Sequence, residues 1–125
     1  PGWYQLHANS RTYRDWKREG HGRVDLAKAV RVSCDTYYYQ LSLKLGIDKI
    51  SEWLNLFGYG FKSDIDLPDE LPGLVPSRAW KRKVKGERWY DGETLNIGIG
   101  QGYLLATPIQ LAQSVALIAN KGHLR

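Results

Sequence analysis

Helix-start and helix-stop signals punctuate this chain of 125 residues and constrain its fold more than any other feature. Residue types that cap helices, followed by apolar residues at helical spacing, mark four windows, which are residues 25–32, 33–46, 48–58 and 107–122. A glycine closes each of the last three windows. In the fourth, Thr107, Pro108 and Gln110 form a capping box with proline at the first helical position. The pattern predicts four helices.

Two stretches lack a helical period. Residues 1–24 carry scattered aromatic residues with turn formers between them, and we expect them to be irregular. Residues 58–93 hold most of the prolines and a dense basic run, so we expect a long irregular insertion with short strands at most. The glycines at 98, 100 and 102 predict a tight structural turn, because their spacing matches neither a dinucleotide fingerprint nor a P-loop. The chain is therefore predicted to be mainly α-helical with one long irregular insertion.

The charge of the chain favours anionic surfaces without identifying one. Eighteen Lys and Arg against 13 Asp and Glu give a net charge of +5, and the basic residues gather in segments 11–31 and 78–88. We interpret both segments as solvated surface and expect no nucleic-acid partner, because no nucleic-acid-binding motif accompanies them. The alternative is a non-catalytic basic module that binds an anionic polymer. No stretch approaches the roughly 18 uncharged apolar residues of a membrane-spanning helix.

The tripeptide Ser33-Cys34-Asp35 places polar side chains at the predicted junction between two helices. Ser33 and Asp35 could point into one cleft, where a hydroxyl can pass protons and a carboxylate can accept an amide hydrogen bond. Simple capping of the helix that begins near Thr36 is the alternative, and local sequence alone favours it, because Ser and Asp are common cap residues.

A second group of polar residues overlaps this tripeptide. Asp15, His21 and Cys34 offer a carboxylate, an imidazole and a thiolate, a set that suits Zn²⁺ when a fourth ligand completes a tetrahedron. His7, or a residue preceding Pro1, is the candidate fourth ligand. The alternatives are a histidine that fills a turn and a buried free thiol.

Several segments, taken together, resemble one known family. They are WYQL, YRDWK and GHG in the first part, SCD at 33–35, and then YYYQLSLKLGID, EWLNLFGYG and IGIGQGYLLATPIQLAQSVALIANKG. The combination is similar to the transpeptidase domain of bacterial penicillin-binding proteins, and most similar to the elongation type, penicillin-binding protein 2. This resemblance implies an α+β parent with the penicillin-binding and serine β-lactamase-like transpeptidase fold. Residues 1–125 would be an internal fragment of that single domain and supply its mainly helical section.

The resemblance also implies roles for the tripeptide. Three motifs build the family's site, and Ser33-Cys34-Asp35 matches the second, Ser-x-Asp. Ser33 would relay protons, and Asp35 would position the donor peptide or the side-chain amide of a β-lactam. No serine in the chain has lysine three positions on, and no Lys-Thr-Gly occurs. We therefore expect a parent that is a serine-type D,D-transpeptidase, cross-linking peptidoglycan stem peptides during cell elongation, and a fragment that is inactive alone.

The family resemblance further implies a structural Zn²⁺ held by Asp15, His21 and Cys34, with an acidic fourth ligand before Pro1 and no cofactor for catalysis. It implies a periplasmic domain of a protein anchored in the inner membrane. β-Lactams would bind the parent. Its partners would be a membrane glycan polymerase and shape-determining proteins.

Overall fold

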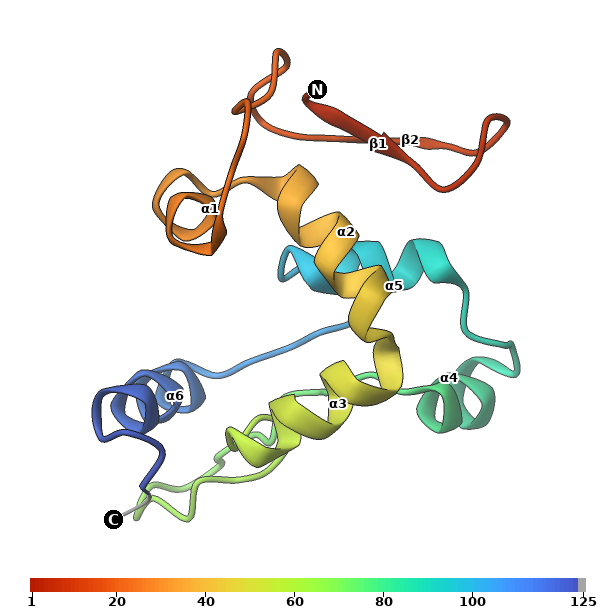
Figure 1. The fold of residues 1–125 in the computed structure, drawn as a ribbon. Coiled ribbons are helices and arrows are strands. Elements are labelled where there is room, and N and C mark those ends of the chain that lie inside the picture. The colour runs from red at the N-terminus through yellow and green to blue at the C-terminus, as the bar shows by residue number, and fades with distance from the viewer. Residues whose placement is uncertain (124–125) are drawn as a thin grey trace.

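The computed structural model describes residues 1–123, which form a two-stranded hairpin followed by six helices (Figure 1). Strands β1 (Trp3–Gln5) and β2 (Thr12–Arg14) are antiparallel. The helices are α1 (Leu26–Val32), α2 (Asp35–Leu45), α3 (Ile47–Leu56), α4 (Arg78–Lys85), α5 (Asp91–Gly98) and α6 (Pro108–Ala119). Among residues 1–123, none of these helices combines the length and apolar character needed to cross a bilayer.

The four predicted helices are confirmed as α1, α2, α3 and α6, and two of them begin at the predicted caps. The Asp25 side chain accepts a hydrogen bond from the Lys28 N–H at 2.8 Å and so begins α1. Thr107 and Gln110 form the reciprocal capping box that begins α6. These local bonds satisfy N–H groups that have no partner within the helix.

The prediction of an irregular first segment is wrong, because residues 1–24 contain the β-hairpin. Each strand has only three residues, too few for an alternating pattern to stand out in the sequence. Tyr4 pairs with Tyr13 across the hairpin. The Tyr13 ring packs edge-on against Tyr39 of α2 with centroids 5.7 Å apart, and the Tyr39 hydroxyl donates to the Arg14 carbonyl at 3.0 Å. The hairpin is therefore fastened to α2.

The prediction of an irregular insertion at residues 58–93 is wrong over α4 and the start of α5. Ser77 caps α4 by accepting from the Trp80 N–H at 3.0 Å. In α4 the buried residue is Lys81, whose ammonium donates to Glu93 of α5 and lies 3.5 Å from Glu87. Burial alone would lower the pKa of Lys81, but the bonds and charges of these two glutamates outweigh it and raise that pKa above its ordinary value. This ion-pair group fastens α4 to the beginning of α5.

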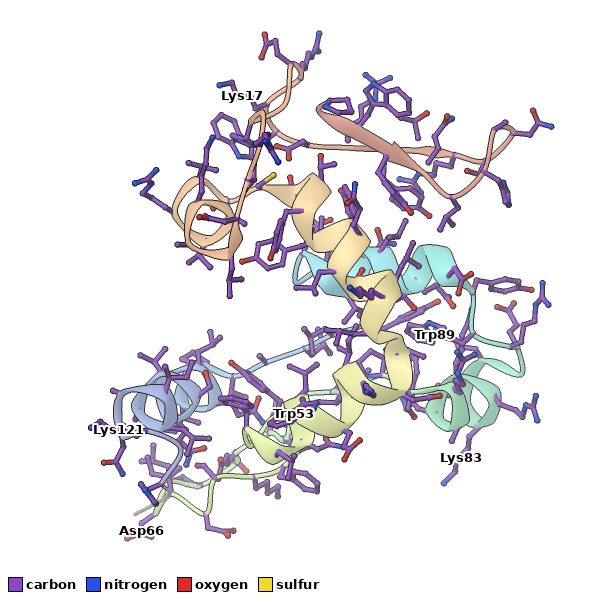
Figure 2. The ribbon with its side chains drawn as sticks, in the orientation of Figure 1. Lys17, Trp53, Asp66, Lys83, Trp89 and Lys121 are labelled. Carbon is purple, nitrogen blue, oxygen red and sulfur yellow. The ribbon has the colours of Figure 1, made fainter. Side chains whose placement is uncertain are left out.

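The centre of the fold is the contact between α2 and α5, the most extensive between any two of its described elements (Figure 1). A Cβ atom at Gly98 would lie 2.6 Å from the Cβ of Ser42 and 3.0 Å from the carbonyl oxygen of Tyr38. Only a residue without a side chain allows two helix backbones to approach so closely. Next to this contact, Ile47, Ile97 and Trp89 form a buried apolar cluster. Figure 2 labels Trp89, which is buried, and Trp53, which is 58% exposed.

We expect Gly98→Ala to destabilise the chain by about 1–3 kcal/mol, because the added methyl group overlaps α2. A helical Gly→Ala change without such an overlap stabilises by about 0.5–1 kcal/mol, so the sign itself is informative. The measurement is the free energy of unfolding in urea. The matched control is Gly98→Ala in a Ser42→Gly background. There the Cβ atom of Ser42, the nearest contact, is absent, and the loss of unfolding free energy caused by Gly98→Ala should be smaller by about 1 kcal/mol. Strictly additive effects would contradict this account of the helix contact.

Candidate functional site

The junction between α1 and α2 turns the chain within two residues. Ser33 ends α1 in the left-handed conformation, with φ 52° and ψ 55°, and Cys34 is extended before α2 begins. Ser33 and Asp35 line one cavity of about 280 Å³, together with residues of α1, α2 and the end of α5. Cys34, which is 4% exposed, does not line this cavity. The sequence-based expectation that Ser33 and Asp35 share a cleft therefore agrees with the geometry.

The capping interpretation of Ser33 and Asp35 is wrong. Neither side chain caps α2, whose N-cap residue is Cys34 without a side-chain bond. The carboxylate of Asp15 takes this role from 21 positions away, accepting from the N–H of Thr36 at 3.1 Å and from its hydroxyl at 3.2 Å. Burial by itself would raise the pKa of Asp15, but the hydrogen bonds from Thr36 and the Lys17 N–H hold that pKa below its ordinary value.

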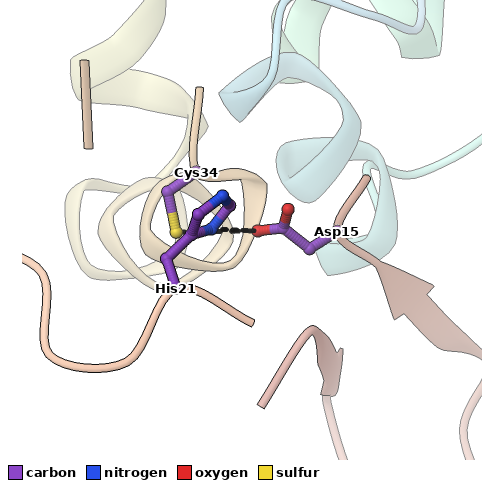
Figure 3. A group of neighbouring side chains, drawn as sticks. All are labelled: Asp15, His21 and Cys34. Atoms are coloured by element: carbon purple, nitrogen blue, oxygen red, sulfur yellow. Dashed lines mark hydrogen bonds and ion pairs between the residues drawn. The ribbon is translucent and has the colours of Figure 1, made fainter. Parts of the chain in front are cut away.

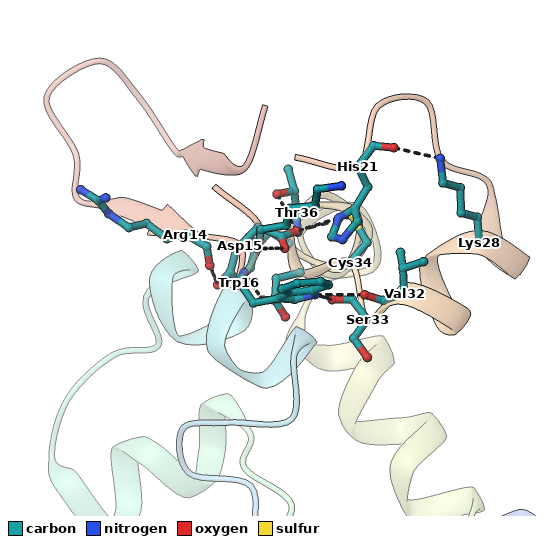
Figure 4. A network of polar contacts seen from close by, with 12 residues as sticks. Arg14, Asp15, Trp16, His21, Lys28, Val32, Ser33, Cys34 and Thr36 are labelled. Atoms are coloured by element: carbon teal, nitrogen blue, oxygen red, sulfur yellow. Dashed lines mark hydrogen bonds and ion pairs between the residues drawn. The ribbon is translucent and has the colours of Figure 1, made fainter. Parts of the chain in front are cut away.

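Besides Asp15, Trp16 also contacts the junction between α1 and α2 (Figure 4). The sequence did not indicate this role of Trp16. Its indole Nε1–H lies 3.0 Å from the carbonyl oxygens of both Val32 and Ser33. Its backbone N–H donates to Oδ2 of Asp35 at 3.3 Å. Burial and the charge of Asp15 raise the pKa of Asp35 above its ordinary value. No local pattern signals these bonds, because they join residues 16 to 19 positions apart.

The three residues proposed as metal ligands do come together, with one ligand atom of each within 4.8 Å of the others (Figure 3). Oδ2 of Asp15 lies 3.6 Å from Nδ1 of His21 and 3.6 Å from Sγ of Cys34. The His21 side chain is 4% exposed, and the residue lies between Gly20 and Gly22, which both have positive φ. Burial raises the pKa of the Cys34 thiol, and the charge of Asp15 raises it further.

The imidazole of His21 supplies a test of whether these residues fit a metal ion. Both ring nitrogens are buried without a hydrogen-bond partner in the part of the chain that the structure describes. A buried polar atom without a partner is costly, and a cation held by nitrogen, sulfur and carboxylate oxygen would remove that cost. The donor set therefore fits a zinc ion. Over residues 1–123 no fourth His, Cys, Asp or Glu joins the group, and His7 is not part of it.

The basic run at residues 78–88 contributes to neither group. Lys81 is buried in its ion pairs, and Arg78 pairs with Asp48 at 3.2 Å. The other basic side chains of the run are exposed: Arg82, Lys83, Lys85 and Arg88. Their exposure agrees with the interpretation of this run as solvated surface, but that interpretation is wrong for the buried Lys81.

Residues 1–125 match the family model of the penicillin binding protein transpeptidase domain. The peptidoglycan D,D-transpeptidase MrdA of Escherichia coli strain K12 is 46% identical over 122 residues, which are 98% of this chain and 19% of that relative. A crystal structure of Pseudomonas aeruginosa PBP2 in complex with WCK 5153 is 54% identical, with a TM-score of 0.94 over 98% of this chain and 28% of that one. PBP2 of Helicobacter pylori, in its complex with MreC, is 41% identical, with a TM-score of 0.91 over 97% of this chain and 22% of that one.

These similarities confirm the resemblance seen in the sequence and the expected fold, a mainly helical part of the transpeptidase fold. The chain spans about a fifth of the length of the curated relatives it matches, 19% in the E. coli case. Because the family model covers all 125 residues and the sequence and structure comparisons agree, this chain belongs to the penicillin-binding protein transpeptidase domain family.

Proposed function

We propose that a protein containing this chain is a peptidoglycan D,D-transpeptidase that cross-links stem peptides through a serine acyl-enzyme during cell elongation. Residues 1–125 would be an internal fragment of its single transpeptidase domain. The observation that carries the proposal is the shared cavity of Ser33 and Asp35 in a chain that matches this domain family throughout. The D,D-transpeptidase activity named for the E. coli relative supports the reaction, and the name of the family supports penicillins as ligands.

In this proposal the two cavity residues act on different parts of the substrate complex. The hydroxyl of Ser33 can donate one hydrogen bond while it accepts another, which suits a proton relay between the lysines of the other two family motifs. The carboxylate of Asp35 is an acceptor, which suits an amide N–H of the donor peptide or of a β-lactam side chain. The acylated serine and its activating lysine would come from outside residues 1–125, because no serine here has lysine three positions on.

We also propose that Asp15, His21 and Cys34 hold a structural Zn²⁺. The buried imidazole without a partner supports this, as does the convergence of three different zinc-ligand types. When bound, the ion would stabilise the fold by joining the first segment to the α1–α2 junction, and it would take no part in catalysis. The fourth ligand would be supplied from before Pro1.

The partners and the location of the parent are part of the same proposal. The complex of H. pylori PBP2 with MreC supports a shape-determining partner. A membrane glycan polymerase, the periplasm and an inner-membrane anchor rest on the family resemblance. Nucleic acid is not a proposed partner.

We expect fluorescent penicillin to label a polypeptide extended at both ends of this chain, and not residues 1–125 alone. In the extended form Ser33→Ala should slow covalent labelling on the order of 100-fold, because a positioned proton-transfer group contributes about that much or more. The measurement is the rate at which fluorescence becomes bound to the protein in denaturing gels. Ser10→Ala is the control and should label normally, because Ser10 lies in the hairpin loop and its hydroxyl bonds to the backbone of His7, away from the cavity.

The same experiment separates the transpeptidase from the alternative basic module. Absence of label in both forms, together with salt-sensitive binding to an anionic polymer, would contradict the transpeptidase and favour the module. A normal labelling rate in Ser33→Ala would contradict the proton-relay role while leaving the transpeptidase assignment intact.

We expect the polypeptide extended upstream of Pro1 to contain about one equivalent of zinc, which Cys34→Ser should release or greatly weaken. The measurement is elemental analysis after removal of loosely bound metal. His7→Ala is the matched control and should retain the zinc, because His7 lies outside the cluster. Zinc content unchanged by Cys34→Ser, or absent from the extended protein, would contradict the site.

A further inference from the structure

We propose that Trp16 is a positioning residue, which holds Ser33 in place through its indole N–H and Asp35 through its backbone N–H. The inference rests on the proposed transpeptidase function and adds one residue to its site. Trp16 donates hydrogen bonds to both neighbours of Cys34. Its indole N–H donates to the carbonyl of Ser33, and its backbone N–H donates to the carboxylate of Asp35. A single residue of the first segment therefore fixes both cavity residues relative to each other.

The indole N–H of Trp16 donates to backbone carbonyl groups at the end of α1 that have no partner within that helix. The last carbonyls of a helix have no intrahelical N–H to accept from. The carbonyl oxygens of Val32 and Ser33, at the end of the seven-residue α1, both lie 3.0 Å from Nε1 of Trp16. One donor shared between two acceptors orients the peptide planes on both sides of the Ser33 α-carbon.

Ser33 requires such support because of its backbone conformation. A residue with a Cβ atom is disfavoured in the left-handed region, where Ser33 lies at φ 52°. Its own N–H bonds to the carbonyls of Ala29 and Val30, and the bond to Val30 is long, at 3.4 Å. The two bonds from the Trp16 indole, at 3.0 Å, are shorter than the bond to Val30. Without them, rotation of the peptide planes around Ser33 would carry its hydroxyl away from the cavity.

Burial does not explain Trp16. The residue is 64% exposed, and its ring is tilted against His21 with centroids 5.2 Å apart. A tryptophan this exposed contributes little to a core, yet its one side-chain donor is directed at two backbone acceptors. The structure thus separates two possible roles of the side chain, the ring contact with His21 and the N–H bonds to the junction.

Trp16→Phe tests the N–H alone, because phenylalanine retains an aromatic ring beside His21 and removes the donor. In the polypeptide extended at both ends, we expect the maximal rate of acylation by fluorescent penicillin to fall about tenfold or more, because small misplacements of positioned groups are costly. The concentration giving half-maximal rate, the thermal midpoint and the zinc content should stay close to those of the unsubstituted protein. Trp53→Phe is the matched control, an exposed tryptophan on α3, and should change none of these.

Hydrogen exchange of the indole N–H in the unsubstituted protein gives a readout that does not depend on activity. The Trp16 indole proton should exchange more slowly than that of Trp53, because only the former is hydrogen-bonded in the described chain. Equal exchange rates would overturn the inference.

The outcomes distinguish this inference from the function on which it rests. Absence of label in the unsubstituted extended protein overturns the transpeptidase proposal and the inference with it. Normal labelling of the unsubstituted protein, with an equal rate in Trp16→Phe, overturns the inference alone. A slower rate that comes with a thermal midpoint well below that of Trp53→Phe also overturns it, because the N–H would then serve stability and not position.

Discussion

The buried carboxylate of Asp15 is the interaction on which the arrangement of the site depends. Its side chain is fully inaccessible, and it accepts hydrogen bonds from the N–H and hydroxyl of Thr36 and from the N–H of Lys17. A buried carboxylate without such donors is strongly destabilising. Because the Thr36 donors belong to α2 and Asp15 follows β2, the charge is satisfied only while the hairpin segment is docked on the helix. That docking also brings Trp16 and His21 to the α1–α2 junction.

The junction directs its side chains into two separate environments. Cys34 is buried beside Asp15 and His21, while Ser33 and Asp35 line the cavity. The left-handed turn at Ser33 followed by one extended residue produces this separation within three positions. Because Ser33 and Asp35 are the direct neighbours of Cys34 in the chain, a displacement of Cys34 would also move both cavity residues.

Local signals account for what the sequence predicts about the fold. Asp25 and Thr107 cap α1 and α6 through bonds to residues three positions away, and such signals are visible in the sequence. α4 was missed because its buried residue is Lys81, which an apolar pattern treats as solvent-exposed. The cap of α2 and the contacts of Trp16 were missed because they join distant positions. The residues of the tripeptide and of the candidate metal site could be named from the sequence, but their supporting bonds could not.

The glycine-rich turn shows how a correct structural interpretation can be incomplete. Gly100 and Gly102 have positive φ, as a tight turn requires. Gly98, at the end of α5, serves a different purpose, since it allows α2 to approach and also lines the cavity of Ser33 and Asp35. A side chain at Gly98 would push the two helices apart and would also occupy space beside the tripeptide. The absence of a side chain at Gly98 therefore serves both the most extensive helix contact among the described elements and the cavity of the candidate site.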